Sequence, residues 1–224
     1  MHNSAMLRLI VLLSLTLLPF AAEARPAADH SPSVFCETAI ASAERSAGLP
    51  ARMMTAIAMT ESGRFDSTAG RVRPWPWTIN AEGAGQYFAS REQAIAAVHA
   101  LRARGVQSID VGCMQVNLMY HPAAFTSVED AFDPQANAQY AARFLTSLFS
   151  AHGHWHKAIG AYHSMTPARA SAYLDLVMAR WQGPSLTVAA VDRSAYQSFA
   201  RADAAYGSFA GSARSYGAFA TVRR

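Results

Sequence analysis

The chain has 224 residues, of which 51% are hydrophobic and 15% are charged, with a formal net charge of +4. Residues 26–183 are enough for one domain with a full hydrophobic core. The segment after Pro184 carries +3 of the charge. The basic balance therefore reflects a basic tail, which excludes a basic nucleic-acid-binding domain as its explanation.

The N-terminus has the pattern of a signal peptide. Arg8 precedes an almost wholly apolar run at residues 9–20, and Ala22-Glu23-Ala24 offers the small-x-small pattern that a signal peptidase cleaves. We expect residues 1–24 to be removed and the protein to be exported to the periplasm. The run is too short to span a membrane, and no later segment has about 18 consecutive apolar residues, so no stable membrane anchor is expected.

The next segments predict two helices and then a hairpin. Ser33 is expected to cap a helix at 34–47, and Pro50 is expected to lie in the first turn of a helix at 51–62. The helical period then disappears, and proline and glycine separate two short β-prone runs, 77–80 and 86–88. These two runs predict a small hairpin.

Further helices follow the hairpin. Ser90-Arg91-Glu92-Gln93 fits a capping box for a helix that ends at Arg104, and irregular structure is expected at 110–122. Three more helices are predicted, at 134–151, 155–163 and 168–182. The fold class is therefore mostly α (α+β), with a small β-hairpin inserted between the second and third helices. We expect a single domain at 25–183.

The C-terminal segment 184–224 has a different composition. Three copies of a short Tyr- and Phe-containing sequence repeat there at ten-residue spacing, among Gly, Ser, Ala and Arg. Such a segment cannot build a core, so a disordered tail is predicted.

Two residue types stand out in the body. The chain has two cysteines, Cys36 and Cys113. In an exported protein a disulfide between them is favoured over two buried thiols, and it would contribute about 4.5 kcal/mol on the chain-entropy scale.

Glu61 completes an apolar stripe with Met54, Ile57 and Ala58 at the end of a predicted helix. Burial and the helix dipole would both raise its pKa, as suits a general acid, whereas the alternative is a Glu at a frayed helix end that points to water.

Three short motifs resemble the ordered motifs of the lytic transglycosylase domain (SLT domain), of the lysozyme-like superfamily. The resemblance covers residues 35–181, nearly the whole body. Its relatives include soluble lytic transglycosylases and small transglycosylases associated with secretion systems and pili. The motifs are Thr60-Glu61-Ser62-Gly63, Asp110-Val111-Gly112-Cys113-Met114-Gln115-Val116-Asn117 and Ala161-Tyr162-His163.

The resemblance implies a lysozyme-like fold and cleavage of the bond between N-acetylmuramic acid and N-acetylglucosamine in peptidoglycan. Glu61 would protonate the glycosidic oxygen and then, as a carboxylate, deprotonate the C6 hydroxyl of the same muramoyl residue. That hydroxyl attacks C1 and leaves a 1,6-anhydro end. The resemblance implies no metal and no cofactor, unlike the usual pair of carboxylates in glycosidases.

The resemblance also assigns roles to the other motif residues. Ser62 would orient Glu61 or the substrate, and Met114 and Gln115 would line the cleft. Asn117 is expected to hold its loop through bonds to the backbone. The Tyr162 hydroxyl would reach Glu61, with a core tyrosine as the alternative. The third motif usually continues with Asn, so His163 introduces a group that titrates near pH 6.5 into a substrate contact.

Rival interpretations remain open. Asp110 as a second catalytic carboxylate would give a hydrolytic muramidase, although a loop-stabilising role is favoured, and a non-catalytic glycan-binding accessory is a further alternative. His152, His154 and His156 lack the spacing of a metal site. Trp77 is either a sugar-stacking surface or a core residue. The sequence does not distinguish general wall turnover from service to a secretion, pilus or flagellar apparatus.

Overall fold

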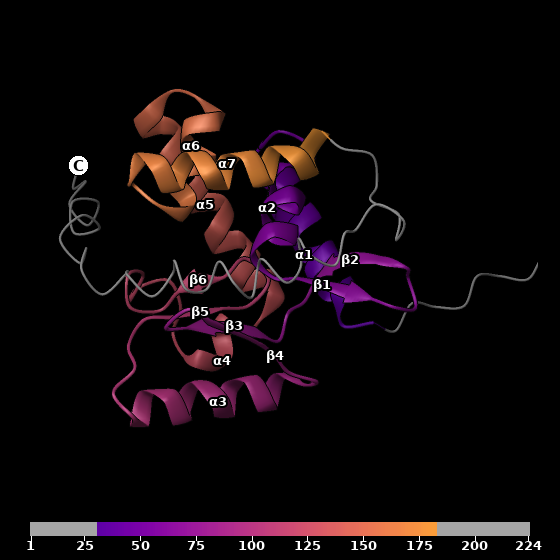
Figure 1. Cartoon of the computed structure of the whole chain (residues 1–224), viewed down its shortest axis with the longest axis vertical. Coiled ribbons are helices and arrows are strands. Elements are labelled where there is room, and N and C mark those ends of the chain that lie inside the picture. The colour runs from indigo at the N-terminus through magenta and orange to yellow at the C-terminus, as the bar shows by residue number, and fades with distance from the viewer. Residues whose placement is uncertain (1–30, 183–224) are drawn as a thin grey trace, which may run out of the picture.

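The computed structural model describes residues 31–182 (Figure 1). The predicted signal peptide at 1–24 and the tail at 184–224 lie outside these residues. The elements follow in the order α1 (Ser33–Ser46), α2 (Met53–Glu61), β1 (Gly63–Asp66), β2 (Arg71–Pro74), β3 (Thr78–Ala81), β4 (Ala84–Tyr87), α3 (Arg91–Ala103), β5 (Ile109–Val111), β6 (Val116–Asn117), α4 (Val128–Ala131), α5 (Pro134–His152), α6 (Trp155–His163) and α7 (Pro167–Gln182).

The predicted helices are confirmed, with α4 as an addition. Ser90 caps α3 by accepting a hydrogen bond from Gln93 N, and Asp133 caps α5 by accepting one from Ala136 N. The predicted cap of α1 is wrong, because Ser33 is the first residue of the helix and its buried hydroxyl has no hydrogen-bond partner within residues 31–182. Pro32 is the N-cap residue and makes no side-chain cap, although the Ser31 hydroxyl accepts a hydrogen bond from Ser33 N at 3.4 Å.

A carboxylate from α1 caps the start of α2. Arg52 adopts a left-handed conformation with φ 66°, and α2 begins at the next residue. Glu44 is buried and accepts hydrogen bonds from Arg52 N at 2.6 Å and Met54 N at 2.8 Å. These are two of the amide groups that the first turn of a helix leaves without partners. The two helices are thereby fixed to each other at the start of α2.

The predicted hairpin is confirmed as β3 and β4, and it belongs to a larger antiparallel sheet with the strand order β4-β3-β5-β6. The prediction of irregular structure at 110–122 missed β5 and β6, which are too short to give a period-two pattern. A separate hairpin, β1–β2, was also missed, and it begins two residues after Glu61.

Two large buried clusters divide the domain, and a small third one lies between α5 and α6. One of the two large clusters lies among α1, α2, α5, α6 and α7, and the other lies between the sheet and α3 with α4. Figure 1 shows the corresponding halves, with α5–α7 on one side and the sheet and α3 on the other. The segment from Ile109 to Val116 contributes to both clusters, since Val111 belongs to the sheet cluster and Met114 to the helical cluster. The second sequence motif therefore lies at the junction.

The predicted disulfide is present. Cys36 of α1 is bonded to Cys113, and both residues are buried. Since 77 residues separate the two cysteines, the bond constrains a long stretch of the unfolded chain. It also attaches the second motif to the first helix.

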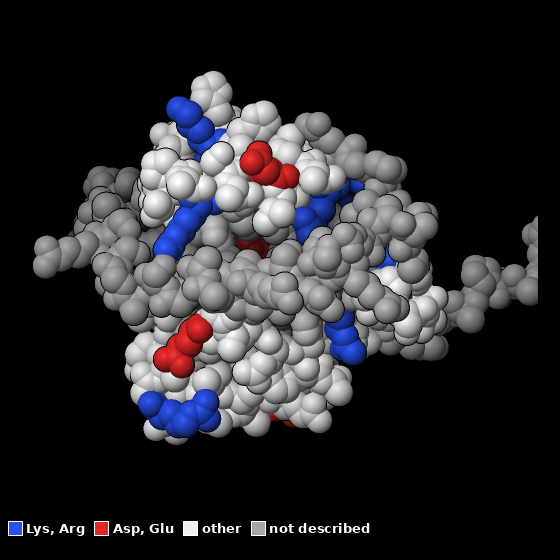
Figure 2. All heavy atoms as spheres, in the orientation of Figure 1, with Lys and Arg blue, Asp and Glu red and all other residues white. Residues whose placement is uncertain are grey.

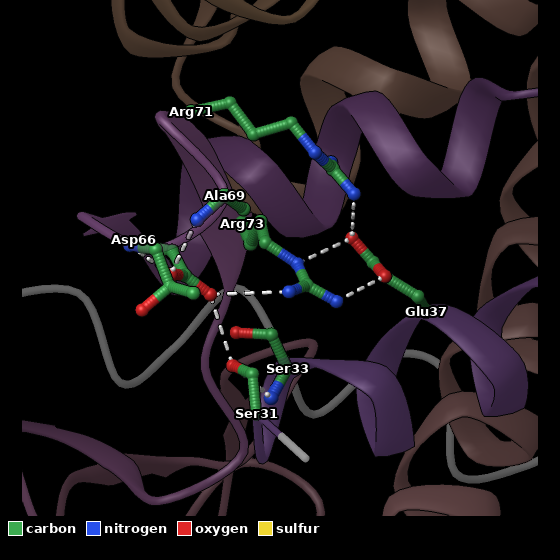
Figure 3. Close-up of polar contacts among 8 residues, drawn as sticks. Ser31, Ser33, Glu37, Asp66, Ala69, Arg71 and Arg73 are labelled. Carbon is green, nitrogen blue, oxygen red and sulfur yellow. Dashed lines mark hydrogen bonds and ion pairs between the residues drawn. The ribbon is translucent and has the colours of Figure 1, made fainter. Parts of the chain in front are cut away.

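A buried ion-pair network attaches the β1–β2 hairpin to α1 (Figure 3). The Arg73 side chain is 1% exposed, and its guanidinium donates to Glu37 at 2.7 and 2.9 Å and to Asp66 at 3.1 Å. Arg71 donates to the same Glu37 from a side chain that is 44% exposed. The hydrogen bond from the Ala69 amide, with further bonds from Ser31, Arg73 and the Thr68 amide, keeps the pKa of Asp66 below its ordinary value despite opposing desolvation. The hairpin that follows Glu61 is therefore anchored by charge rather than by apolar packing.

We expect Arg73→Met to lower the free energy of unfolding by about 3 kcal/mol, because it leaves partly buried carboxylates without their counter-charge. Arg71→Met is the matched control and should cost below about 1 kcal/mol, since an exposed pair is screened by water. Urea denaturation at neutral pH measures both variants. Equal, small effects would show that the network does not stabilise the hairpin.

Candidate active site

Glu61 is the last residue of α2, and the apolar stripe below it is confirmed. Met54, Ile57 and Ala58 are all fully buried in the helical cluster. Glu61 itself is only partly exposed, so the helix carries a carboxyl group to the edge of the core without releasing it into water. In the view of Figure 2, acidic atoms lie at the bottom of a hollow, with basic side chains beside it.

A tyrosine of the last helix holds the Glu61 carboxyl. The Tyr173 hydroxyl donates to Glu61 Oε1 at 2.6 Å, and Tyr173 is 4% exposed. The expectation that Tyr162 would make this bond is wrong, because the Tyr162 hydroxyl donates to the Met114 carbonyl at 2.8 Å. Tyr173 was missed because it lies outside the recognised motifs, and its spacing from Val177 indicates only a buried helix face.

The pKa of Glu61 is raised to about 8, as the sequence predicted in direction. Desolvation is the largest cause, since burial penalises the carboxylate more than the neutral acid. The Tyr173 hydrogen bond acts in the opposite direction, and the negative charge of Asp110 raises the pKa further. At neutral pH Glu61 therefore carries a proton, as a general acid must.

Asp110 of β5 is a second carboxyl group, close enough to Glu61 for its negative charge to raise the Glu61 pKa. Desolvation raises its pKa to about 7, although the hydrogen bond from Asn117 Nδ2, 2.8 Å long, lowers it. The predicted role of Asn117 is confirmed, because its Oδ1 accepts from the amides of Met119 and Tyr120. Asn117 of the neighbouring strand β6 therefore holds Asp110 and also organises the loop that follows β6.

The loop 112–115 is held by side chains from several helices. The fully buried Ser62 donates its hydroxyl to the Cys113 carbonyl at 2.7 Å. Gln115 has the left-handed φ of 47°, and its Nε2 donates to the carbonyls of Gly112 and Thr78. Met114 is fully buried. The side chains of Ser62 and Met114 are therefore buried, whereas Gln115 is partly exposed.

Asn137 of α5 is a site-supporting residue that the sequence did not reveal. It is fully buried, its Oδ1 accepts from Met114 N, and its Nδ2 donates to the carbonyls of Val111 and Ala131. Gly112 passes so close that a Cβ there would lie 2.6 Å from Asn137 Nδ2. Since Gly112 also has φ +80°, glycine is required twice over at this position.

His163 ends α6 and lies against Tyr173. The two rings are parallel within 5°, with centroids 4.6 Å apart. Burial, with Arg169 nearby, lowers the pKa of His163 to about 4. The expectation of titration near pH 6.5 is therefore wrong, because desolvation disfavours the imidazolium form and leaves the ring neutral at ordinary pH.

The tryptophans of the β2–β3 connection have different environments. Trp77 is 8% exposed and packs in the sheet cluster, so the core interpretation holds. Trp75 is more accessible, with its Nε1 bonded to the Phe88 carbonyl and the Arg64 guanidinium 4.3 Å above its ring. Trp75 is therefore the better placed of the two to meet a ligand.

The described part of the chain contains neither a metal cluster nor a membrane-spanning helix. Within residues 31–182, no group of three or more His, Cys, Asp or Glu side chains is placed to hold a metal ion. None of the helices in this part of the chain is long and apolar enough to cross a membrane.

The geometry and the motifs agree with a comparison against known families. The transglycosylase SLT domain matches residues 38–173, which is more than half of the chain. The chain belongs to the SLT domain family. No match is found among curated proteins or solved structures.

Membership of this family confirms the resemblance and the mostly α-helical, lysozyme-like fold. SLT domains are glycan-cleaving transglycosylases that act on peptidoglycan, a polymer outside the cytoplasmic membrane. The matched range includes Glu61, the loop 112–115, Tyr162 and Tyr173. The residues that the geometry brings together are thus all within the SLT domain.

Glu61→Gln should stabilise the protein at alkaline pH. The Glu61 pKa is about 8 in the folded state and about 4.5 in the unfolded state, so only the folded state keeps the proton between these values. Its contribution to the free energy of unfolding therefore falls as pH rises through that range. We expect Glu61→Gln to exceed the wild type by roughly 5 kcal/mol at pH 9, since each unit of pKa difference corresponds to about 1.4 kcal/mol, and to match it near pH 4.5.

Urea denaturation at the two pH values measures this difference, and the acidic measurement serves as the internal control. A stability difference that is the same at both pH values would contradict a raised Glu61 pKa.

Proposed function

We propose that this SLT domain is a peptidoglycan lytic transglycosylase in which Glu61 acts first as the acid and then as the base. The observation that carries the proposal is the Glu61 carboxyl, protonated at neutral pH and bonded to Tyr173 through one oxygen. Within residues 31–182, its other oxygen accepts no hydrogen bond. Held in this way, the carboxyl group is oriented through one oxygen and can exchange a proton through the other.

The proposed first step is proton transfer from Glu61 to the glycosidic oxygen that links N-acetylmuramic acid to N-acetylglucosamine. The bond between C1 and that oxygen breaks, and the N-acetylglucosamine hydroxyl leaves with the proton. Positive charge then develops on the muramoyl ring. The Glu61 carboxylate that remains is stabilised by the Tyr173 hydroxyl, since a hydrogen bond to a charged acceptor is stronger than one to a neutral acceptor.

In the second step the carboxylate removes the proton of the C6 hydroxyl of the same muramoyl residue. The C6 oxygen forms a bond to C1, which closes the 1,6-anhydro ring. Glu61 regains its proton and returns to its starting state. The proton that Glu61 gives up in the first step is therefore replaced in the second step, and no water is consumed.

The other site residues have proposed roles that follow from their positions. Gln115 is the candidate for direct contact with the glycan, because it is partly exposed and its amide is oriented by two carbonyls. Ser62, Met114 and Tyr162 would contribute by fixing the loop under the substrate. Trp75 is a candidate for stacking on a sugar ring, because aromatic faces pack against pyranose C–H groups.

The place of action follows from the same proposal. Residues 1–24 would direct export to the periplasm, where the wall polymer is accessible. The partner would be the peptidoglycan glycan strand, and a secretion, pilus or flagellar apparatus is the class of assembly whose passage through the wall would need such an enzyme.

Mass spectrometry of a peptidoglycan digest tests the reaction. We expect muropeptides one water lighter than hydrolytic products, carrying 1,6-anhydro ends. Glu61→Gln should lower turnover on the order of 10³-fold, because the amide cannot supply a proton. Products with hydrated reducing ends would instead identify a muramidase, and the absence of products from the wild type would identify a glycan-binding protein.

Asp110→Asn tests the hydrolytic alternative, which the second carboxyl group in the site favours. We expect the variant to keep its activity, with the alkaline limb of the pH profile at lower pH, because a neutral amide no longer raises the Glu61 pKa. The Asn117 bond can persist to the new amide oxygen, so the loop is retained. A loss as complete as that of Glu61→Gln would make Asp110 a second catalytic group.

A further inference from the structure

The contact between His163 and Tyr173 is the feature that the proposed reaction leaves unexplained. Their rings are stacked, with planes parallel within 5° and centroids 4.6 Å apart. His163 is the last residue of α6, and Tyr173 lies in the second turn of α7. The Tyr173 hydroxyl is the group that reaches Glu61. The His163 imidazole therefore contacts Tyr173, which in turn bonds the Glu61 carboxyl.

The two helices are held close enough to impose this stack. A Cβ at Gly160 would lie 3.0 Å from the Ala170 carbonyl oxygen, so α6 and α7 meet there at nearly backbone contact. The connection between them is short, and the Ser164 hydroxyl accepts from Thr166 N within it. His163 and Tyr173 flank this close approach, so their relative position is fixed by the backbone.

We propose that His163 is a positioning residue that acts through Tyr173: its ring stacks on the phenol and fixes the direction in which the hydroxyl meets Glu61. This inference rests on the proposed function, since it concerns the same carboxyl group. A phenol ring can turn about its bonds to the backbone, and a flat neighbour on its face restricts that motion. The hydroxyl at the ring's far end then stays on Glu61 Oε1.

The charges around Glu61 show why the direction of the hydroxyl matters. Tyr173 on α7 is the donor that favours the carboxylate, whereas Asp110 on β5 disfavours it, and Tyr162 on α6 lies within electrostatic reach. The Glu61 carboxylate must form in each catalytic cycle. Only the Tyr173 bond favours it among these three groups, so losing the alignment of that bond would slow proton transfer and raise the Glu61 pKa.

His163 suits this role because its ring is flat and uncharged. Burial, with a smaller contribution from the nearby Arg169, lowers the pKa of the imidazole to about 4, so the ring carries no charge at neutral pH. The Asn that usually follows the tyrosine in this motif has a small amide that cannot cover a phenol ring. The departure from the motif thus replaces a polar amide with an aromatic plane.

Four variants of the full chain test the proposal through turnover of isolated peptidoglycan. We expect His163→Ala to lower kcat roughly tenfold with little change in KM, because the bond it disturbs is one to a charged acceptor. His163→Phe keeps an aromatic plane and should restore kcat to within about threefold of the wild type. Tyr173→Phe should lose at least as much as His163→Ala. His156→Ala, from the exposed face of α6, is the matched control and should behave as the wild type.

The double variant is the sharpest measurement. If His163 acts through the Tyr173 hydroxyl, adding His163→Ala to Tyr173→Phe should change kcat by less than about twofold, because the group that it positions is already absent. A further tenfold loss would overturn the proposal. So would a rise in KM that His163→Phe fails to rescue, since that pattern indicates direct contact between the imidazole and the glycan.

A readout that is independent of turnover separates this inference from the proposed function. The carboxyl resonance of Glu61, assigned by comparison with Glu61→Gln, gives its pKa by carbon-13 NMR. We expect the pKa to rise by roughly one unit in His163→Ala and to stay near the wild-type value in His163→Phe. An unchanged pKa in His163→Ala would overturn the positioning role, whereas a wild type without 1,6-anhydro products would overturn only the proposed function.

Discussion

Residues 112–114 are buried at the junction of the two large clusters, and their backbone polar groups need partners there. Side chains supply several of these partners: Ser62 bonds the Cys113 carbonyl, Asn137 bonds the Met114 amide, and Tyr162 bonds the Met114 carbonyl. The disulfide to Cys36 adds a covalent link. Four helices thus meet on one loop, and the position of the site follows from satisfying that loop.

Glu61 is held by the same set of contacts, because Ser62 follows it in the chain. The bond from Ser62 to the Cys113 carbonyl fixes the end of α2, and Gly63 then begins the hairpin that Arg73 anchors to α1. A desolvated carboxyl group destabilises the folded state at any pH where it must ionise. The disulfide and the ion-pair network offset that cost close to where it arises.

The sequence was informative where a signal is local. Periodicity and capping residues predicted the helices, and the apolar stripe predicted the burial of Glu61, because these features depend on residues a few positions apart. Apart from the disulfide, it was uninformative where partners are distant. Tyr173 meets Glu61 across 112 residues, and the hydrogen bonds of Asn137 cross 23 residues to Met114 and 26 residues to Val111. An Asn among alanines and a Tyr on a buried helix face are both common in ordinary helix packing, so only the fold identifies these partners.

Two tyrosines hold the loop 112–115 and the Glu61 carboxyl in place. Tyr162 on α6 fixes the loop that is expected to meet the glycan, and Tyr173 on α7 fixes the acid. The two helices meet in close contact where Gly160 faces Ala170, so this contact sets the relative position of the two tyrosines. A side chain at position 160 would separate the helices and disturb both hydrogen bonds at once.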